Sequence, residues 1–219
     1  MDLLIFDFDG LIVDTETPDL ESWQEIFAEF RCELPLDVWA HCIGAAPDVF
    51  DPCDHLEKLL GRAVERAVVR ERRRKRFYEL VERQPVLPGV EEYLESAPGL
   101  GIGCTVASSA PRAWVAGHLE RLNLLDKFSC IKCSDEIPRA KPEPDLFLAV
   151  LEATGVAADR AVVLEDSPNG IAAAAAAGIY CVAVPNPVTA SLGLDGADLL
   201  VRSLAEMPLA ELAARVGRA

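Results

Sequence analysis

The chain has 219 residues, of which 51% are hydrophobic and 26% are charged, a composition typical of globular proteins rather than disordered or fibrous ones. Twenty-one basic and 36 acidic side chains give a net charge of −15, which disfavours nucleic acid and anionic membranes as partners. The longest apolar run, 171–184, is interrupted by Gly178 and is shorter than the roughly 20 residues that span a bilayer. The N-terminus lacks the features of a secretory signal, so we expect a cytoplasmic protein.

The first predicted element is a buried strand at 3–6, and a different pattern follows it from Thr15 to Gln84. In this block apolar residues recur at the 3.6-residue period of helices, and strand-like runs are almost absent. Apolar faces of two predicted helices comprise Trp23, Ile26, Phe27 and Phe30 in one, and Leu56, Leu59 and Leu60 in the other. We therefore expect a helical insertion at 15–84 on a core formed by 1–14 and 85–219, with Pro85 and Pro88 suited to a stiff hinge.

A basic run lies inside this insertion, from Arg70 to Arg76. Such a run can form a binding patch, but it is more typical of a solvated helix face, where the charges stay in water. We therefore expect no general polyanion binding from it.

Five further apolar, β-branched runs follow the insertion and predict strands at 104–107, 129–133, 161–164, 180–184 and 199–201. Helix-start signals come after two of them: Ser108, Ser109 and Pro111 in one case, Ser167 and Pro168 in the other. Strands that alternate with helices at this spacing predict an α/β fold, in which a mainly parallel sheet is covered by helices on both faces.

Seven cysteines, an odd number without dense regular spacing, favour reduced thiols. Cys130 and Cys133 form a C-x-x-C on a predicted strand, where positions three apart point to opposite faces. We expect buried thiols at these two positions rather than a metal site.

Polar residues follow the predicted strands at positions that suit a ligand site, because open parallel sheets bind ligands beyond the carboxyl ends of their strands. Asp7 and Asp9 come after the first strand, and Glu165 and Asp166 come after the strand at 161–164. Four carboxylates on one rim are costly unless a hard cation lies among them. Magnesium fits best, since it prefers oxygen ligands and is often held together with a substrate phosphate.

Two further positions suit phosphoryl oxygens. Ser108 provides a hydroxyl next to a predicted helix start, and Lys141 provides an ammonium in a loop before another helix. Each of these residues alone has an ordinary structural explanation as a cap or a solvated loop residue. Their joint placement predicts a site that binds a phosphate and a metal ion together.

Four segments of the chain resemble the haloacid dehalogenase superfamily, in particular its β-phosphoglucomutase-like branch. These segments are DFDGLIVDTE from Asp7, VASS ending at Ser109, KPEPD from Lys141, and LEDSPNG containing Glu165 and Asp166. The resemblance implies a Rossmann-like, doubly wound α/β core with an inserted helical cap, and a magnesium-dependent phosphoric monoester hydrolase.

The resemblance also implies a role for each matching residue. Asp7 would be the nucleophile that forms an aspartyl phosphate, and Asp9 the general acid and base. The metal would be bound by the Asp7 side chain, the Asp9 carbonyl and Asp166, with Glu165 in support. The phosphate would be held by Ser108, Ser109 and Lys141.

Alternatives share parts of this pattern. A phosphomutase would have the same catalytic residues, but sugar phosphomutases of this branch carry an arginine shortly after a cap glycine, and here Gly44 is followed by Ala45, Ala46 and Pro47. A metal-free dehalogenase would not need Asp9 or Asp166 as carboxylates, and a signalling receiver would be much shorter. A binding module derived from a dead enzyme would lack a catalytic position, and none is missing. We expect a phosphatase that acts as a monomer on a small phosphorylated metabolite, either a sugar phosphate or a nucleotide-like monophosphate.

Overall fold

The computed structural model describes residues 1–40 and 50–217 of the chain. Residues Gly44 to Pro47, on which the comparison with phosphomutases depends, lie outside the described residues. Within the described part, the strands are β1 (Leu3–Phe6), β2 (Gly103–Ser108), β3 (Cys130–Cys133), β4 (Ala161–Glu165), β5 (Tyr180–Ala183) and β6 (Leu199–Leu200). All six predicted strands are confirmed, and no boundary differs by more than one residue.

These strands form one parallel sheet in the order β3-β2-β1-β4-β5-β6. The order reverses direction between β1 and β4, so the carboxyl ends of these two strands meet at the topological switch point of a doubly wound fold. In β1 all four residues are buried, as expected for a central strand that is covered on both faces.

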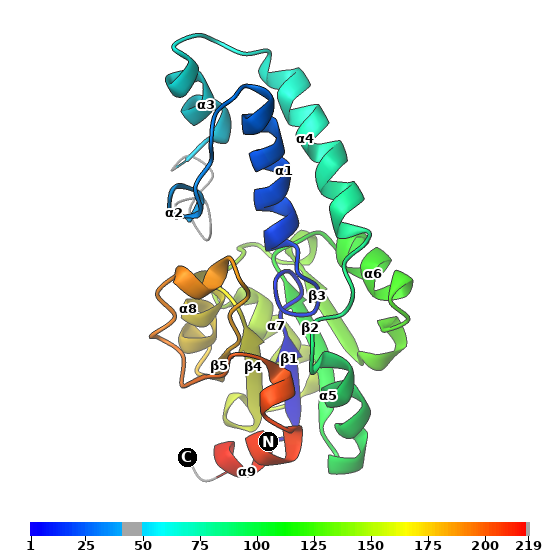
Figure 1. The fold of residues 1–219 in the computed structure, drawn as a ribbon. Coiled ribbons are helices and arrows are strands. Elements are labelled where there is room, and N and C mark those ends of the chain that lie inside the picture. The colour runs from blue at the N-terminus through cyan, green and yellow to red at the C-terminus, as the bar shows by residue number, and fades with distance from the viewer. Residues whose placement is uncertain (41–49, 218–219) are drawn as a thin grey trace.

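Helices cover both faces of this sheet (Figure 1). Their bounds are α1 (Glu16–Glu29), α2 (Leu36–Trp39), α3 (Pro52–Leu60), α4 (Arg66–Val81), α5 (Val90–Ser96), α6 (Arg112–Arg121), α7 (Asp145–Thr154), α8 (Pro168–Ala176) and α9 (Leu209–Val216). Leu4 and Phe6 of β1 pack in a core with α5, α6 and α9, and Leu3 and Ile5 pack in another core with α7 and α8. The predicted α/β class with two covered faces is therefore confirmed.

Local sequence signals explain where two of these helices begin. At α8, the Ser167 side chain accepts a hydrogen bond from the Gly170 N–H and Pro168 occupies the first turn, as predicted. At α6 the prediction of a serine cap was wrong: Pro111 itself holds the cap position, and no side chain caps the helix. The Ser108 hydroxyl instead accepts from the Ala110 N–H inside the preceding loop.

Helices α1 to α4, here called the helical layer, stand together beyond the carboxyl end of the sheet (Figure 1). Trp23, Ile26 and Phe27 are buried in a separate apolar core of this layer, as their spacing predicts. Leu56 is buried as well, but Leu59 is 51% exposed, because it lies to one side of the face that Leu56 and Leu60 share.

Two chain segments connect the helical layer to the sheet, and they lie side by side. Val13 and Val86 form an antiparallel bridge, and the Leu87 N–H donates to the Ile12 carbonyl at 2.9 Å. The boundaries 15–84 for a separate cap domain remain a prediction.

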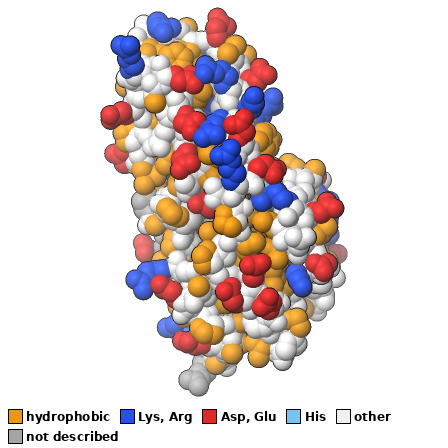
Figure 2. Space-filling view, turned by 45° about the vertical axis from the view of Figure 1, so that its right-hand side comes forward, with side chains coloured by type: hydrophobic (Ala, Val, Ile, Leu, Met, Phe, Trp, Pro, Cys, Tyr) orange, Lys and Arg blue, Asp and Glu red, His pale blue; other side chains and the backbone are white. Residues whose placement is uncertain are grey.

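The basic run lies on α4 and is largely ion-paired within the helical layer. Arg70 pairs with Asp51, Arg72 with Glu29, Arg73 with Asp19, and Arg76 with Glu25. Figure 2 shows positive and negative side chains next to one another on the upper part of this face. The run is therefore a paired helix face rather than a uniform positive patch.

Six cysteines in the described part of the chain are free thiols. Cys133 is buried and Cys130 is partly buried, on alternate sides of β3. The predicted geometry of the C-x-x-C is confirmed, and the two sulfurs do not face a common site. Across the described residues, no helix has the length and apolar character needed to cross a membrane.

Candidate active site

Three acidic side chains meet where β1 and β4 end. The two strands pair in parallel with Phe6 opposite Leu164, so Asp7 follows one strand beside the end of the other. The Asp7 N–H donates to the Leu164 carbonyl at 2.9 Å. One carboxylate oxygen from each of Asp7, Glu165 and Asp166 lies within 4.8 Å of the other two. The structure therefore brings together three of the four predicted acidic residues through their side chains.

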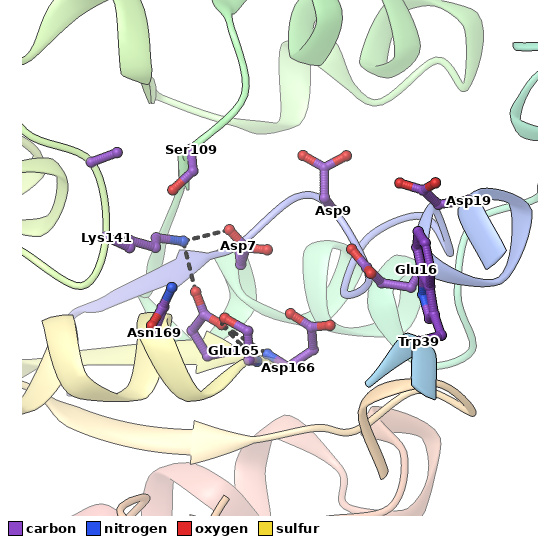
Figure 3. A pocket seen from close by; sticks show the side chains of 12 residues that line it. Asp7, Asp9, Glu16, Asp19, Trp39, Ser109, Lys141, Glu165, Asp166 and Asn169 are labelled. Carbon is purple, nitrogen blue, oxygen red and sulfur yellow. Dashed lines mark hydrogen bonds and ion pairs between the residues drawn. The ribbon is translucent and has the colours of Figure 1, made fainter. Parts of the chain in front are cut away.

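Lys141 joins this acidic group from the loop before α7, with its side chain only 4% exposed. Its ammonium donates to the Asp7 carboxylate and to Glu165 Oε1 at 2.7 Å (Figure 3). It also donates to the Ala107 carbonyl at 2.8 Å. Burial lowers the pKa of Lys141, but the charges of Asp7 and Glu165 outweigh burial and raise it above its ordinary value. The carboxylates around it therefore favour the charged form of Lys141, and its ammonium is directed at the predicted nucleophile.

Glu165 fixes both Lys141 and the loop that carries Asp166. One of its oxygens accepts from Lys141, and the other accepts from the Asp166 and Ser167 N–H groups at 3.0 Å and from the Ser167 hydroxyl at 2.9 Å. Helix α8 approaches so closely that a Cβ on Gly170 would lie 1.7 Å from Glu165 Oε1. Both oxygens of Glu165 are thus engaged by protein donors, which suits it to orient Lys141 and the loop that carries Asp166.

Asp166 is held by Asn186, which was not among the predicted site residues. The Asn186 side-chain amide donates to Asp166 Oδ2 at 2.7 Å, and both residues are buried. Asn186 follows β5, so the rule that identified Asp7 and Asp166, a polar residue after a predicted strand, would also have identified it. Gly10 lies against the same two side chains. Its φ is 79°, and a Cβ at this position would lie only 2.2 Å from Asp166 Oδ2, so there is no room for one.

The acidic group carries more negative charge than Lys141 can balance. Burial is the largest cause that raises the pKa of Asp7 to about 8, with further contributions from Glu165 and Asp9 against the opposing effect of Lys141. Burial, followed by the charges of Glu165 and Asp7, also raises the pKa of Asp166 well above its ordinary value. A buried all-oxygen donor set with excess negative charge matches the chemistry of a hard divalent cation.

Asp9 lies apart from this group. Its carboxylate accepts from the Trp114 indole N–H at 2.9 Å and from the Ser108 hydroxyl at 3.3 Å, and Figure 3 shows it pointing away from Asp7. Burial raises the pKa of Asp9, against the lowering effect of hydrogen bonds from Trp114, Thr15 and Ser108. Any metal contact of Asp9 would therefore come from its backbone rather than from this side chain.

The two predicted phosphate-binding serines lie in different environments. Ser108 is fully buried and bonded to Asp9, whereas Ser109 is exposed and lines the cavity. Ser109 is the one whose side chain reaches the space in front of Asp7 and Lys141 (Figure 3).

A cavity of about 380 Å³ opens over these residues, between the sheet and the helical layer. It is lined by Asp7, Asp9, Glu16, Asp19, Trp39, Ser109, Ala140, Lys141, Glu165, Asp166, Ser167 and Asn169. Three of these residues, Glu16, Asp19 and Trp39, were not predicted to belong to the site. Glu16 ends the first family-like segment, but nothing in the local sequence around Asp19 or Trp39 indicates that they face a ligand.

A second group of possible metal-ligating side chains lies outside this cavity, at Cys133, Asp135 and Glu136. Its carboxylates are already used: the Arg112 guanidinium pairs with Glu136, and the Arg112 N–H donates to Asp135. These contacts stabilise the turn after β3, so the group needs no cation.

Comparison with known proteins assigns this site to a family. Residues 4–184 match the model of the haloacid dehalogenase-like hydrolases. The chain is 44% identical over 209 residues to "Putative phosphatase YhcW" of Bacillus subtilis (strain 168), covering 95% of this chain and 94% of that protein. It is 30% identical over 187 residues to "Phosphorylated carbohydrates phosphatase" of Thermotoga maritima, covering 82% of each chain.

A solved structure agrees with these matches. A "putative beta-phosphoglucomutase from Thermotoga maritima" superposes with a TM-score of 0.79 at 27% identity, covering 98% of this chain and 99% of that one. Its likeness extends over nearly the full chain, the helical layer included. The chain belongs to the haloacid dehalogenase-like hydrolases and is an enzyme that hydrolyses phosphate esters.

Proposed function

We propose that this enzyme is a magnesium-dependent phosphatase that hydrolyses a small phosphomonoester, a sugar phosphate above all, through an aspartyl phosphate on Asp7. The observation that carries the proposal is the arrangement of Asp7, Glu165, Asp166 and Lys141 around one end of a cavity. This end of the cavity offers a nucleophilic carboxylate, a fixed cation and an acidic group suited to a metal ion.

The chemistry follows from the position of each group. An Asp7 oxygen attacks phosphorus as the bond to the leaving oxygen breaks, and Asp9 gives that oxygen a proton. Asp9 then takes a proton from a water molecule, which attacks the phosphoryl group and releases Asp7. Lys141 lowers the repulsion between the anionic phosphate and Asp7, and Ser109 is available to a phosphoryl oxygen.

The residues present fit a magnesium ion. Asp7 and Asp166 would hold it through their side chains, with Asn186 fixing Asp166 and Glu165 supporting the loop. When bound, magnesium would neutralise charge on the phosphoryl oxygens and hold the phosphate against Asp7.

The leaving group should be a hydroxyl-rich molecule without a second phosphate. Lys141 is the single cation among the described residues that line the cavity. The helical layer adds the acceptor Glu16, and it adds Asp19, whose charge is balanced by Arg73. Carboxylates accept hydrogen bonds from sugar hydroxyls but repel a distal phosphate. This supports a phosphatase over a bisphosphate-dependent mutase, and relatives named for phosphorylated carbohydrates and for hexitol agree with it.

The helical layer is well placed to act as the cap. It forms one wall of the cavity, and its two connections to the sheet run side by side, which allows a hinge at residues 12–15 and 84–88. Closure over the substrate would exclude bulk water from the phosphoryl group.

The first experiment is hydrolysis of 4-nitrophenyl phosphate with and without magnesium, by the natural chain and by Asp7→Asn. We expect magnesium-dependent turnover that Asp7→Asn abolishes while its circular dichroism spectrum stays unchanged. Turnover retained by Asp7→Asn would contradict the nucleophile assignment. A panel of sugar monophosphates, with glucose 1,6-bisphosphate added in a parallel series, would then separate phosphatase from mutase.

A further inference from the structure

Trp114 contacts the predicted acid and base of the reaction, although it does not line the cavity in front of Asp7. It lies in the first turn of α6, half-buried, and its indole Nε1–H donates to Asp9 Oδ1 at 2.9 Å. The Ser108 hydroxyl occupies the other Asp9 oxygen at 3.3 Å. The orientation of the Asp9 carboxylate is thus set by hydrogen bonds from Trp114, Ser108 and Thr15, and the bond from Trp114 is shorter than the one from Ser108.

Aromatic rings hold the indole in place. Phe77 of α4 stacks on it at 5.7 Å between centroids with the rings 14° from parallel, and Tyr78 meets it edge-on at 5.7 Å. His118, one turn along α6, packs edge-on at 4.2 Å. The ring of Trp114 therefore joins the core to the helical layer at the point where its N–H reaches Asp9, next to a second cavity of about 360 Å³.

The direction in which Asp9 points suits its proposed role. In an in-line displacement the leaving oxygen emerges on the side of phosphorus opposite the nucleophile. Asp9 lines the same cavity as Asp7, and its carboxyl group points away from Asp7 (Figure 3). A phosphoryl group bound between the two residues would have Asp7 on one side and Asp9 on the other.

We propose that Trp114 is a positioning residue that orients Asp9 for proton transfer to the leaving group, with its own position fixed by Phe77; this inference rests on the proposed phosphatase function. In the step concerned, the bond from Asp7 to phosphorus forms, the bond to the leaving oxygen breaks, and the Asp9 proton passes to that oxygen. An indole N–H only donates, so it can hold Oδ1 without competing for the proton that Asp9 must transfer.

Leaving groups of different acidity test this role, because a weakly acidic leaving group needs the proton from Asp9 and a strongly acidic one does not. Phenyl phosphate and 4-nitrophenyl phosphate are close in shape, but phenol is the much weaker acid. The quantity to compare is kcat/KM, which covers the steps up to release of the leaving group. General acid catalysis raises a reaction rate roughly 10²- to 10⁴-fold. We expect the loss of one orienting donor to lower kcat/KM about tenfold.

The informative variant is Trp114→Phe, which keeps an aromatic ring against Phe77 and removes the N–H. We expect kcat/KM to fall about tenfold on phenyl phosphate and less than twofold on 4-nitrophenyl phosphate. Tyr78→Phe is the matched control, since Tyr78 contacts the same indole without touching Asp9, and both rates should stay within about twofold of the natural chain. An equal loss on both substrates, or no loss on either, would overturn the proposal.

A second variant covers the case in which Trp114→Phe folds poorly by circular dichroism. Phe77→Leu keeps the indole N–H but removes the stacked ring, and we expect a smaller loss, about threefold, again confined to phenyl phosphate. A loss that does not depend on the leaving group would point to packing alone and overturn the proposal. Failure of the natural chain to hydrolyse 4-nitrophenyl phosphate would count against the proposed function itself, so the two failures are distinguishable.

Discussion

Replacement of Lys141 by methionine is the sharpest test of the charge balance in the site. Methionine keeps much of the length and apolar volume of the lysine stem but removes the ammonium. The Lys141 side chain is 4% exposed, and the side chains of its partners Asp7 and Glu165 are 9% and 1% exposed. Removal of one partner from a buried ion pair costs about 3–5 kcal/mol because the remaining charge has no counter-ion. We expect a loss of this size in the free energy of unfolding at pH 8 without magnesium.

The pH dependence distinguishes this cause from a simple loss of packing. As the pH falls toward 5, the Asp7 carboxylate, whose pKa burial raises to about 8, binds a proton, and the charge that Lys141→Met leaves unpaired there disappears. The deficit in unfolding free energy should therefore shrink by more than half between pH 8 and pH 5. Saturating magnesium should also raise the melting temperature of Lys141→Met more than that of the natural chain, because the cation replaces the missing positive charge.

Urea denaturation in EDTA at both pH values, followed by circular dichroism, measures the deficit. Lys127→Met is the matched control: Lys127 is exposed, so this change should alter stability by no more than about 0.5 kcal/mol. A deficit in Lys141→Met that is the same at pH 5 and pH 8, or smaller than about 1 kcal/mol, would refute the argument that the ammonium balances buried carboxylates.

Two further predictions concern the metal-binding end of the cavity. Gly10→Ala should weaken magnesium binding at least tenfold and lower activity, because its Cβ would meet Asp166 Oδ2 at 2.2 Å; Gly61→Ala, at φ of 64° with open space around it, isolates the backbone cost. Magnesium titration of the two variants checks this, and equal affinities for magnesium would contradict it. Burial raises the pKa of Asp7 to about 8 from 3.8, so the native state holds a proton that the unfolded chain releases, and the metal-free protein should lose stability as pH rises from about 4 to about 8. Melting temperatures measured across this pH range in EDTA and in magnesium check this. We expect a flatter pH profile in magnesium, and a melting temperature that rises with pH in EDTA would refute the prediction.

Much of the fold could be predicted from the sequence because its signals are local. A buried parallel strand needs a short run of apolar, β-branched residues, and all six such runs are strands. Asp7 and Asp166 could be placed near each other before any coordinates, since parallel strands carry the residues that follow them to one edge of the sheet. The helical period of residues 15–84 likewise predicted helices, and the apolar residues Trp23, Ile26 and Phe27 of this segment are buried.

Other features depend on contacts between segments that are far apart in the chain, and no local pattern encodes those. Ser108 and Ser109 are neighbours, yet the fold buries one against Asp9 and exposes the other to the cavity. Glu165 is paired by Lys141 from a loop 24 residues away, and Trp114 reaches Asp9 across 105 residues. Periodicity reports which face of an element is apolar, whereas the direction of a polar side chain depends on the donors and acceptors that packing brings to it.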